Sequence, residues 1–282
     1  MEFENKVAVI TGGGGGIGRS MALALAGSGT HTVIADIDEE GLANVKQEIE
    51  ASGCQALAVF CDVSKDADVD YLAEEAFSTF GRVDFLMNNA GVMLRGYAEK
   101  IPMEEWEWIL GINLFGVIRG IRAFIPHMIE RGSGYVVNTS SLGGLVGGQP
   151  FSISYSTSKF AVSGLTEVLY KYLRPKGIGV SLLCPGGVGT NIRHNIRFTG
   201  GDDPRDLGGN QNPRLGQPGV ADPDDVAQSV ITAMKENQFL ILTDTERLQA
   251  VIQRRNQDLQ GFLDTQIAQA KKLADIKKTK EK

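Results

Sequence analysis

The residues best suited to chemistry in this sequence are a tyrosine and a lysine four positions apart, Tyr155 and Lys159, in the run YSTSK. Two side chains at this spacing lie one above the other on a single helix face. An ammonium group beside a phenol favours the phenolate and lowers the pKa of the tyrosine from its usual value of about 10. Helices also carry such pairs without any function, so the pair predicts acid–base chemistry only if the rest of the chain supports it.

A second candidate site is the glycine-rich run Thr11–Gly18, TGGGGGIG, between a short apolar run and a helical pattern. Glycines at a strand-to-helix turn let the backbone approach a pyrophosphate, and the helix N-terminus then faces the anion. Asp36 ends the next strand-like run, where its carboxylate can accept hydrogen bonds from a ribose diol and would repel a 2′-phosphate. Because Gly15, Ile37 and Asp38 are not basic, the charge pattern favours NAD over NADP. The alternative for Asp36 is a helix N-cap.

The elements that must position these residues alternate between strand-like and helical patterns. Most strand-like segments are continuous apolar runs, which is typical of a parallel sheet covered by helices on both faces. Right-handed crossovers then predict a doubly wound, Rossmann-type α/β sheet of about seven strands. The expected strands are residues 6–10, 31–36, 55–61, 84–88, 134–139, 179–183 and 239–242. The expected helices are residues 17–28, 39–52, 67–80, 104–129, 154–173, 223–236 and 246–276.

The chain is expected to form one catalytic domain over residues 1–243, followed by a C-terminal helical extension with a charged tail over residues 244–282. Glycine, proline and asparagine crowd residues 200–219. We therefore expect a mobile substrate loop over about residues 190–222. The apolar stripe of the last helix predicts core packing or a subunit contact rather than a role at a membrane.

Composition and charge restrict the classes of partner. The net charge is −6 and the isoelectric point is about 5.2, which argues against nucleic acid or an anionic membrane as the main partner. The N-terminus lacks the layout of a signal peptide, and the longest apolar runs are too short to cross a bilayer. The three histidines and three cysteines show no metal-ligand spacing. We expect a cytoplasmic, metal-free protein that acts on a small molecule.

The sequence resembles the short-chain dehydrogenase/reductase family over about residues 6–190. The glycine-rich run, the run Asn88-Asn89-Ala90-Gly91 and YSTSK occur in the order typical of that family. Each motif alone is weak, but the combination is highly specific. The resemblance implies a dinucleotide cofactor, with NAD expected and NADP disfavoured by charge. The residues expected to hold it are Gly12, Gly16, Ile17, Gly18, Asp36, Asp62, Val63, Asn89, Ala90, Gly91, Tyr155, Lys159, Pro185, Gly186, Val188 and Thr190.

The resemblance also assigns catalytic roles, because hydride transfer to or from a carbonyl carbon needs a group that moves a proton on the oxygen. It implies that Tyr155 is this acid–base and that Lys159 lowers its pKa and binds the nicotinamide ribose. Ser141 corresponds best to the serine that orients the substrate oxygen. Ser140 stays an alternative because the segment between Ser141 and Tyr155 is one residue longer than expected. Asn113 resembles an asparagine that holds a relay water, with structural hydrogen bonding as the alternative.

The expected substrate pocket is mostly apolar or glycine. Its lining is expected from Met93, Leu94, residues 142–151 and the loop after Thr190. Without a cluster of arginines or lysines, it predicts a neutral, apolar secondary alcohol or ketone of alicyclic, aromatic or steroid-like type. The resemblance implies a homo-oligomer, a dimer or tetramer. The alternatives are a non-catalytic dinucleotide-binding sensor or scaffold, and an NAD-retaining sugar epimerase or dehydratase, which would need a larger C-terminal substrate domain.

Overall fold

The computed structural model describes residues 2–190, 192, 196–200, 220–243 and 245–268. The chain divides into two compact units, Met1–Asp244 and Thr245–Lys282. The first unit is built on a parallel sheet of seven strands in the order β11-β7-β6-β4-β1-β2-β3. Its strands are β1 (Val7–Thr11), β2 (His31–Asp36), β3 (Ala56–Phe60), β4 (Phe85–Asn88), β6 (Gly134–Thr139), β7 (Ile178–Cys184) and β11 (Leu240–Leu242). The doubly wound fold expected from the apolar runs is confirmed.

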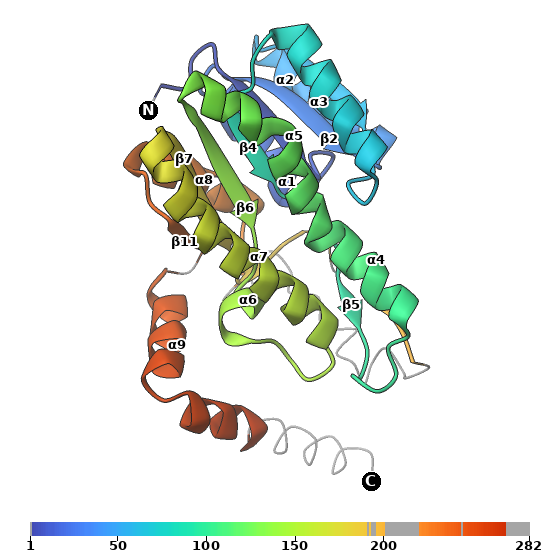
Figure 1. Cartoon of the computed structure of the whole chain (residues 1–282), viewed down its shortest axis with the longest axis vertical. Helices are drawn as coiled ribbons and strands as arrows, with labels where there is room; N and C mark the ends of the chain where they lie inside the picture. The colour runs from blue at the N-terminus through green and yellow to red at the C-terminus, as the bar shows by residue number, and fades with distance from the viewer. Residues whose placement is uncertain (1, 191, 193–195, 201–219, 244, 269–282) are drawn as a thin grey trace. The chain divides into compact units, whose positions relative to one another are not determined.

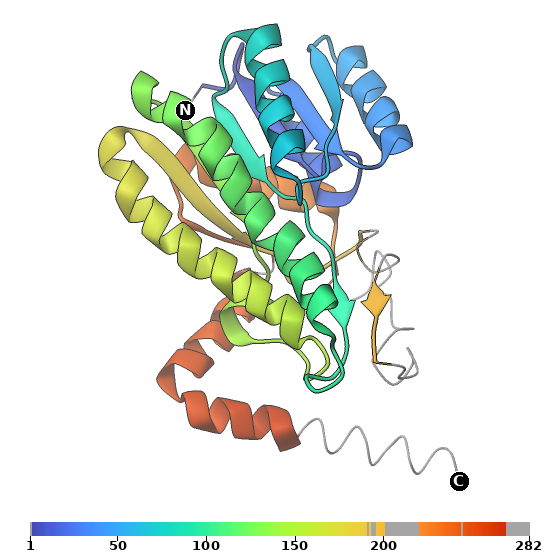
Figure 2. The same cartoon turned by 45° about the vertical axis from the view of Figure 1, so that its right-hand side comes forward.

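Helices cover both faces of this sheet (Figures 1 and 2). On one face lie α1 (Gly16–Ala26), α2 (Glu39–Ala51) and α8 (Pro223–Glu236), whose apolar side chains form one core with alternate strand residues. On the other face lie α3 (Asp66–Phe80), α5 (Phe115–Arg131) and α7 (Ile153–Leu173), which form a second core with the remaining strand residues. In β1, for example, Ala8 and Ile10 enter the first core, and Val7 and Val9 enter the second. Strand residues on both faces are therefore apolar, as a covered parallel sheet requires.

The long helix expected over residues 104–129 is interrupted, which corrects that prediction. It consists of α4 (Met103–Asn113) and α5, separated by Leu114 with φ −107° and ψ −58°. An apolar pattern alone could not reveal this break, because the apolar positions keep a helical spacing across it.

The expectation that no apolar run is long enough to cross a bilayer needs a correction, because the stretch Met103–Arg131 is long and apolar enough by length and composition alone. Core helices of soluble proteins pass the same test. The buried Phe124 and Met128 of α5 belong to the second core of the sheet, so this stretch has the contacts of a core helix.

The helix expected over residues 246–276 is also interrupted. The structure has α9 (Thr245–Gln257) and a second helical stretch over residues 259–268. Asp258 lies between them, and its side chain accepts a hydrogen bond of 2.9 Å from the Gly261 backbone N–H, which caps the second stretch. Residues 269–276 lie outside the described part of the chain. The single continuous helix is therefore wrong for the described residues.

Several short elements of the first unit escaped sequence patterns. The strand β5 (Leu94–Arg95) pairs with β9 (Arg197–Phe198), and β8 (Gly187–Val188) pairs with β10 (Val220–Ala221). The short helix α6 (Gly143–Val146) and the 3-10 turn η1 (Arg174–Lys176) complete the first unit. Both β9 and β10 fall within the expected substrate loop, whereas residues 201–219 of that loop lie outside the described residues. Two-residue strands are too short for any periodic signal.

Candidate active site

The predicted glycine-rich turn joins β1 to α1 at the carboxyl edge of the sheet. Gly12 and Gly16 have φ of +67° and +52°, a conformation that favours glycine. The packing is also tight: a Cβ on Gly18 would lie 2.0 Å from the Gly12 carbonyl oxygen, and a Cβ on Gly12 would lie 2.9 Å from the Ala90 Cα. The N-cap of α1 is itself a glycine, Gly15, so no side chain caps this helix end. The turn can therefore present backbone N–H groups to an anion.

Asp36 lies beside this turn at the end of β2. Its Oδ2 accepts a hydrogen bond of 3.0 Å from the Gly14 N–H, and its Oδ1 accepts bonds of 2.8 Å from Ile37 and 3.2 Å from Asp38. The N-cap of α2 is Asp38, whose side chain accepts a bond from the Gly41 N–H. The alternative role of Asp36 as a helix cap is therefore wrong, and its carboxylate is instead fixed against the glycine turn.

The run that ends β4 ties the glycine turn to the centre of the sheet. The N–H groups of Asn89 and Ala90 both donate to Thr11 Oγ1, at 3.0 and 3.1 Å. Asn89 Nδ2 donates to the Thr11 carbonyl at 3.1 Å, and Thr139 Oγ1 donates to Asn89 Oδ1 at 3.2 Å. Neighbouring Gly91 leaves room for catalytic groups, because a Cβ there would lie 3.3 Å from both Lys159 Nζ and Asn113 Oδ1.

Lys159 lies on the first turns of α7 and is 3% exposed. Its Nζ donates to the Thr139 carbonyl oxygen at 3.0 Å and lies 5.9 Å from the centre of the Tyr155 ring. The Tyr155 ring packs partly buried against an apolar cluster that includes Leu94 and Ile109. Burial lowers the pKa of Lys159 to about 8, although the nearby Cys184 thiol group acts in the opposite direction. The two residues therefore share one helix face, with the ammonium held at a fixed distance from the phenol ring.

The two strand-end serines have different surroundings. Ser140 Oγ is buried, donates to the Lys159 carbonyl oxygen at 2.8 Å and lies 2.9 Å from Ser163 Oγ. Ser141 Oγ accepts a bond of 3.1 Å from the Gly143 N–H. A Cβ on Gly143 would lie 3.5 Å from Ser141 Oγ and 3.8 Å from Tyr155 Cε1. The Ser141 hydroxyl and the Tyr155 ring therefore border the same small volume. The Ser140 hydroxyl instead hydrogen-bonds to α7.

The Asn113 side chain is fully buried at the end of α4. Its Oδ1 accepts a bond of 2.8 Å from the Val92 N–H, and its Nδ2 donates to the Val92 carbonyl and to Ser158 Oγ, both at 3.0 Å. Ser158 Oγ in turn donates to the Tyr155 carbonyl oxygen at 2.7 Å. The side chain thus has the structural bonds expected of a buried amide and connects three segments of the site.

The segment after β7 completes the site. Leu142 N–H donates to the Pro185 carbonyl at 2.8 Å, and Gly186 N–H donates to Thr243 Oγ1 at 3.1 Å. Thr190 closes over the glycine turn, since a Cβ on Gly16 would lie 3.2 Å from the Thr190 Cβ. The side chains of Ile17 and Val188 pack in the core on one face of the sheet rather than facing the site. Asp62 and Val63 follow Phe60 and Cys61, the two residues that pair with Asp36 at the end of β3.

Three residues that position this site were given no role in the sequence prediction, although they lie within or beside its motifs: Thr11, Thr139 and Ser158. Each of them supplies a hydroxyl or carbonyl oxygen to a predicted residue. Thr11 and Thr139 share one signal, a hydroxyl residue at the last position of a buried strand. The position of Ser158 gives no signal, because it interacts with Asn113 only through tertiary packing. Within the described ranges, no group of three or more His, Cys, Asp or Glu side chains could hold a metal ion.

The burial of Lys159 predicts a pH-dependent stability. Because its pKa is lowered in the folded state, unfolded chains bind a proton that folded chains lack between about pH 8 and about pH 10.5. The free energy of unfolding of the wild-type protein therefore increases with rising pH in this window. Lys159→Met removes the titration, so the stability of the variant relative to wild type should fall as the pH rises from about 8 to about 10.5. Urea unfolding of both proteins across this range measures it, and a difference that does not change with pH contradicts it.

Comparison with known proteins gives a consistent picture. Residues 6–199 match the family described as short chain dehydrogenase. The CLA biosynthesis dehydrogenase/reductase of Lactiplantibacillus plantarum is 36% identical over 258 residues, which cover 87% of this chain and 90% of that protein. The 3beta-hydroxysteroid dehydrogenase 2 of Eggerthella lenta is 39% identical over 195 residues, covering 68% and 74% of the two chains. A short chain dehydrogenase/reductase from Burkholderia phymatum, solved in complex with NAD, superposes with a TM-score of 0.83 at 37% identity, covering 92% of this chain and 95% of the other.

Proposed function

The chain belongs to the short chain dehydrogenase family of oxidoreductases, and we propose that it interconverts a secondary alcohol and a ketone with NAD as the hydride carrier. One observation carries the proposal. Lys159 Nζ is anchored by the Thr139 carbonyl and lies 5.9 Å from the centre of the Tyr155 ring. The Ser141 hydroxyl borders the same volume as that ring. A proton donor, a cation that tunes it and a hydroxyl that orients the substrate are thus held together.

The residues of the glycine turn fit a dinucleotide. The positive φ of Gly12 and Gly16 and the tight contacts of Gly18 leave a backbone surface without side chains at the start of α1, suited to a pyrophosphate. The Asp36 carboxylate, held by backbone N–H groups, is suited to a ribose diol. A bound nicotinamide supplies the hydride chemistry of the reaction. We assign the remaining predicted contacts, Asp62, Val63, Asn89 to Gly91 and Pro185 to Thr190, to the same cofactor.

Tyr155 is the proposed general acid–base. In oxidation its phenolate oxygen takes the proton of the substrate hydroxyl, and in reduction its phenol gives a proton to the carbonyl oxygen. The Lys159 ammonium stabilises the phenolate and thereby lowers the pKa of the tyrosine. Ser141, rather than Ser140, orients the substrate oxygen, because the Ser140 hydroxyl is occupied by the Lys159 carbonyl and Ser163.

Asn113 has a positioning role in this proposal. Both of its amide hydrogens are used, by the Val92 carbonyl and by Ser158 Oγ, and its Oδ1 already accepts the Val92 N–H. A relay water could therefore hydrogen-bond only to the second lone pair of Asn113 Oδ1. This atom lies close to Gly91, as does Lys159 Nζ. Structural hydrogen bonding thus accounts for most of this side chain, and a relay through Oδ1 remains a secondary proposal.

The proposed substrate is neutral and apolar. Besides Ser141 and Lys159, the described neighbours of Tyr155 are aliphatic and aromatic: Val92, Leu94, Ile101, Trp106 and Ile109 belong to its cluster. Apolar surroundings of this kind favour an alicyclic, aromatic or steroid-like alcohol or ketone. The name of the relative from Eggerthella lenta, a 3beta-hydroxysteroid dehydrogenase, agrees with this class.

A screen of secondary alcohols and ketones with NAD and NADP in parallel tests the proposal. Turnover of apolar alicyclic or aromatic substrates is expected, and turnover restricted to phosphorylated or CoA-linked compounds would contradict the substrate class. A sensor or scaffold would bind the dinucleotide without any turnover. An epimerase or dehydratase would convert a nucleotide-linked sugar without net change in its NAD.

We also propose that the protein is a cytoplasmic homo-oligomer, a dimer or tetramer. Light scattering would measure the mass of the oligomer.

The preference for NAD can be tested at Asp36. Replacing it with Ser removes a charged acceptor from the ribose diol, so we expect the affinity for NADH to fall about tenfold and NADPH to be tolerated better. Adding Gly15→Arg should improve NADPH binding further, because a Cβ on Gly15 meets no atom within 4 Å. Asp38→Ser is the matched control, since it removes the same charge two residues away while keeping a helix-capping side chain. A wild-type protein that prefers NADP would refute the charge argument.

A further inference from the structure

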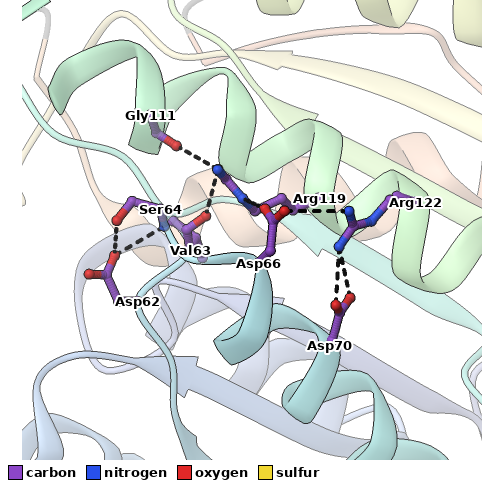
Figure 3. Close-up of polar contacts among 8 residues, drawn as sticks. All are labelled: Asp62, Val63, Ser64, Asp66, Asp70, Gly111, Arg119 and Arg122. Atoms are coloured by element: carbon purple, nitrogen blue, oxygen red, sulfur yellow. Dashed lines mark hydrogen bonds and ion pairs between the residues drawn. The ribbon is translucent and has the colours of Figure 1, made fainter. Parts of the chain in front are cut away.

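Arg119 on α5 connects three segments that are far apart in the sequence (Figure 3). Its Nη1 donates to the Val63 carbonyl at 3.2 Å and to the Gly111 carbonyl at 3.1 Å. Its Nε donates to Asp66 Oδ1 at the start of α3. The side chain is 19% exposed, so most of this guanidinium is shielded from water. One partly buried arginine therefore holds two backbone carbonyls and one carboxylate together.

The first carbonyl belongs to the turn that follows β3. This turn is next to the ribose-binding candidate, because the Cys61 N–H donates to the Asp36 carbonyl at 3.0 Å. Asp62 Oδ1 accepts bonds from the Ser64 N–H at 3.0 Å and from Ser64 Oγ at 2.7 Å. These bonds fix the turn locally, and the Asp62 N–H donates to Asp68 Oδ2 of α3 at 3.0 Å, which attaches the turn to that helix. The family resemblance assigns Asp62 and Val63 of this turn to the adenine end of the dinucleotide.

The second carbonyl belongs to the break between α4 and α5. In a continuous helix the Gly111 carbonyl would accept a hydrogen bond from the N–H group four residues later, that of Phe115. Here the helix is interrupted at Leu114. The Arg119 guanidinium supplies a donor to this carbonyl. Gly116 brings the two segments close, because a Cβ on it would lie 2.9 Å from Val63 Cγ2. The turn after β3 is therefore attached to the helix break by Arg119 and by direct packing at Gly116.

We propose that Arg119 is a positioning residue for the adenine end of the cofactor, which it serves by fixing the turn at Asp62 and Val63 against the break between α4 and α5. The inference rests on the proposed dinucleotide function and names a residue that need not touch the cofactor. Loss of the guanidinium leaves two carbonyls and the Asp66 carboxylate without this donor, so the turn keeps its bond to Asp68 but loses its hydrogen-bonded link to the break between α4 and α5. The cofactor must then order the turn on binding, which weakens its affinity.

Arg122 provides a matched control one turn further along α5. It pairs with Asp70 at 2.9 Å and with Asp66 at 3.6 Å, and its side chain is 54% exposed. Within the described part of the chain, Arg122 reaches carboxylates only, whereas Arg119 also holds backbone carbonyls (Figure 3). Exposed ion pairs of this kind contribute little to stability. Removing Arg122 therefore changes the charge of the same helix face without releasing the turn.

The test compares Arg119→Gln, Arg119→Lys and Arg122→Gln by calorimetric titration with ADP-ribose, which lacks the nicotinamide. We expect Arg119→Gln to raise the Kd for ADP-ribose about tenfold, as for the loss of a charged hydrogen bond, and Arg122→Gln to leave it within about twofold. The Kd for NADH should rise by the same factor, with kcat at saturating cofactor changed less than about threefold. Arg119→Lys keeps the charge but cannot reach both carbonyls and Asp66 together, so an intermediate Kd is expected.

Equal Kd values for Arg119→Gln and Arg122→Gln would overturn the inference. So would a loss of kcat in Arg119→Gln with unchanged ADP-ribose affinity, because Arg119 would then act on the catalytic end. If Arg119→Gln does not fold, Arg119→Lys and Gly116→Ala decide. Gly116→Ala pushes on Val63 with Arg119 intact, and unchanged ADP-ribose affinity in both variants would refute the proposal. Wild-type protein that binds neither ADP-ribose nor a dinucleotide would overturn the proposed function as well, whereas the other outcomes concern Arg119 alone.

Discussion

Tyr155→Phe is expected to lower kcat by about 10²- to 10⁴-fold, the range for loss of a general acid–base. The substitution removes only the phenolic oxygen. The ring keeps its packing against Leu94 and Ile109, and Lys159 keeps its bond to the Thr139 carbonyl. The fold and the Kd for NADH should therefore stay close to wild type, so that the loss appears in turnover and not in cofactor binding.

Steady-state kinetics at saturating cofactor measure this loss, and fluorescence titration with NADH measures the binding. Tyr170→Phe is the matched control, because Tyr170 lies on the same helix and packs edge to face against Phe239, outside the candidate site. Its kcat should stay within about twofold of wild type, as for other substitutions away from reacting groups. Retention of near wild-type kcat by Tyr155→Phe would exclude it as the acid–base.

Gly18→Ala should weaken NADH binding by about 10- to 100-fold, since overpacking a tight contact costs about 1–3 kcal/mol and each 1.4 kcal/mol is a factor of ten. A Cβ on Gly18 would lie 2.0 Å from the Gly12 carbonyl oxygen and 2.8 Å from Asn89 Nδ2. The first contact is backbone, so the glycine turn itself must move. Because the same turn is the proposed pyrophosphate site, its displacement reaches the cofactor directly.

Gly15→Ala separates this steric effect from a general loss of glycine. Gly15 has φ −168° and ψ 177°, an extended conformation that any residue adopts, and a Cβ there meets no atom within 4 Å. Its NADH affinity should stay within about twofold of wild type. Thermal unfolding of both variants reports whether Gly18→Ala also lowers Tm. Equal NADH affinity in the two variants would show that the tight contact at Gly18 is not needed for the cofactor.

Much of the fold is predictable because its strands are buried on both faces. Continuous apolar runs identify the seven strands of the main sheet, and the amphipathic segments between them identify the helices. The breaks at Leu114 and Asp258 lie beside hydrogen bonds of particular side chains instead. Arg119 takes the Gly111 carbonyl near the first break, and Asp258 caps the helix after the second. Neither bond leaves a trace in the apolar periodicity.

The candidate site is predictable where a residue type is tied to a fixed turn or strand end. The glycine turn, Asp36 and the pair on α7 belong to this group. The alternatives at Ser140 and Asn113 depend on which partners tertiary packing supplies. Ser140 is occupied by the Lys159 carbonyl, and Asn113 by Val92 and Ser158. Sequence spacing cannot distinguish these arrangements, because the partners lie on separate segments.

Substrate specificity is least predictable from the sequence for the same reason. The apolar surroundings of Tyr155 come from α4, from β5 and from residues near Ile101, which meet only in the folded chain. The pairing of β5 with β9 adds a segment from beyond residue 190. Arg197 of β9 lies 3.7 Å from the Trp108 ring centre and pairs with Glu105 at 3.1 Å, which attaches that segment to α4. A pocket assembled this way has no sequence motif.

Deuterium labelling tests the proposed hydride transfer most directly. Wild-type protein is incubated with NADH carrying deuterium at the transferable C4 position and with a panel of alicyclic and aromatic ketones. The account predicts that deuterium appears on the carbinol carbon of at least one alcohol product with the wild-type protein. It also predicts that Tyr155→Phe, while still binding NADH, gives almost no labelled alcohol. Wild-type protein that binds NADH but labels no alcohol, or a Tyr155→Phe variant that labels it as fast as wild type, would contradict the account.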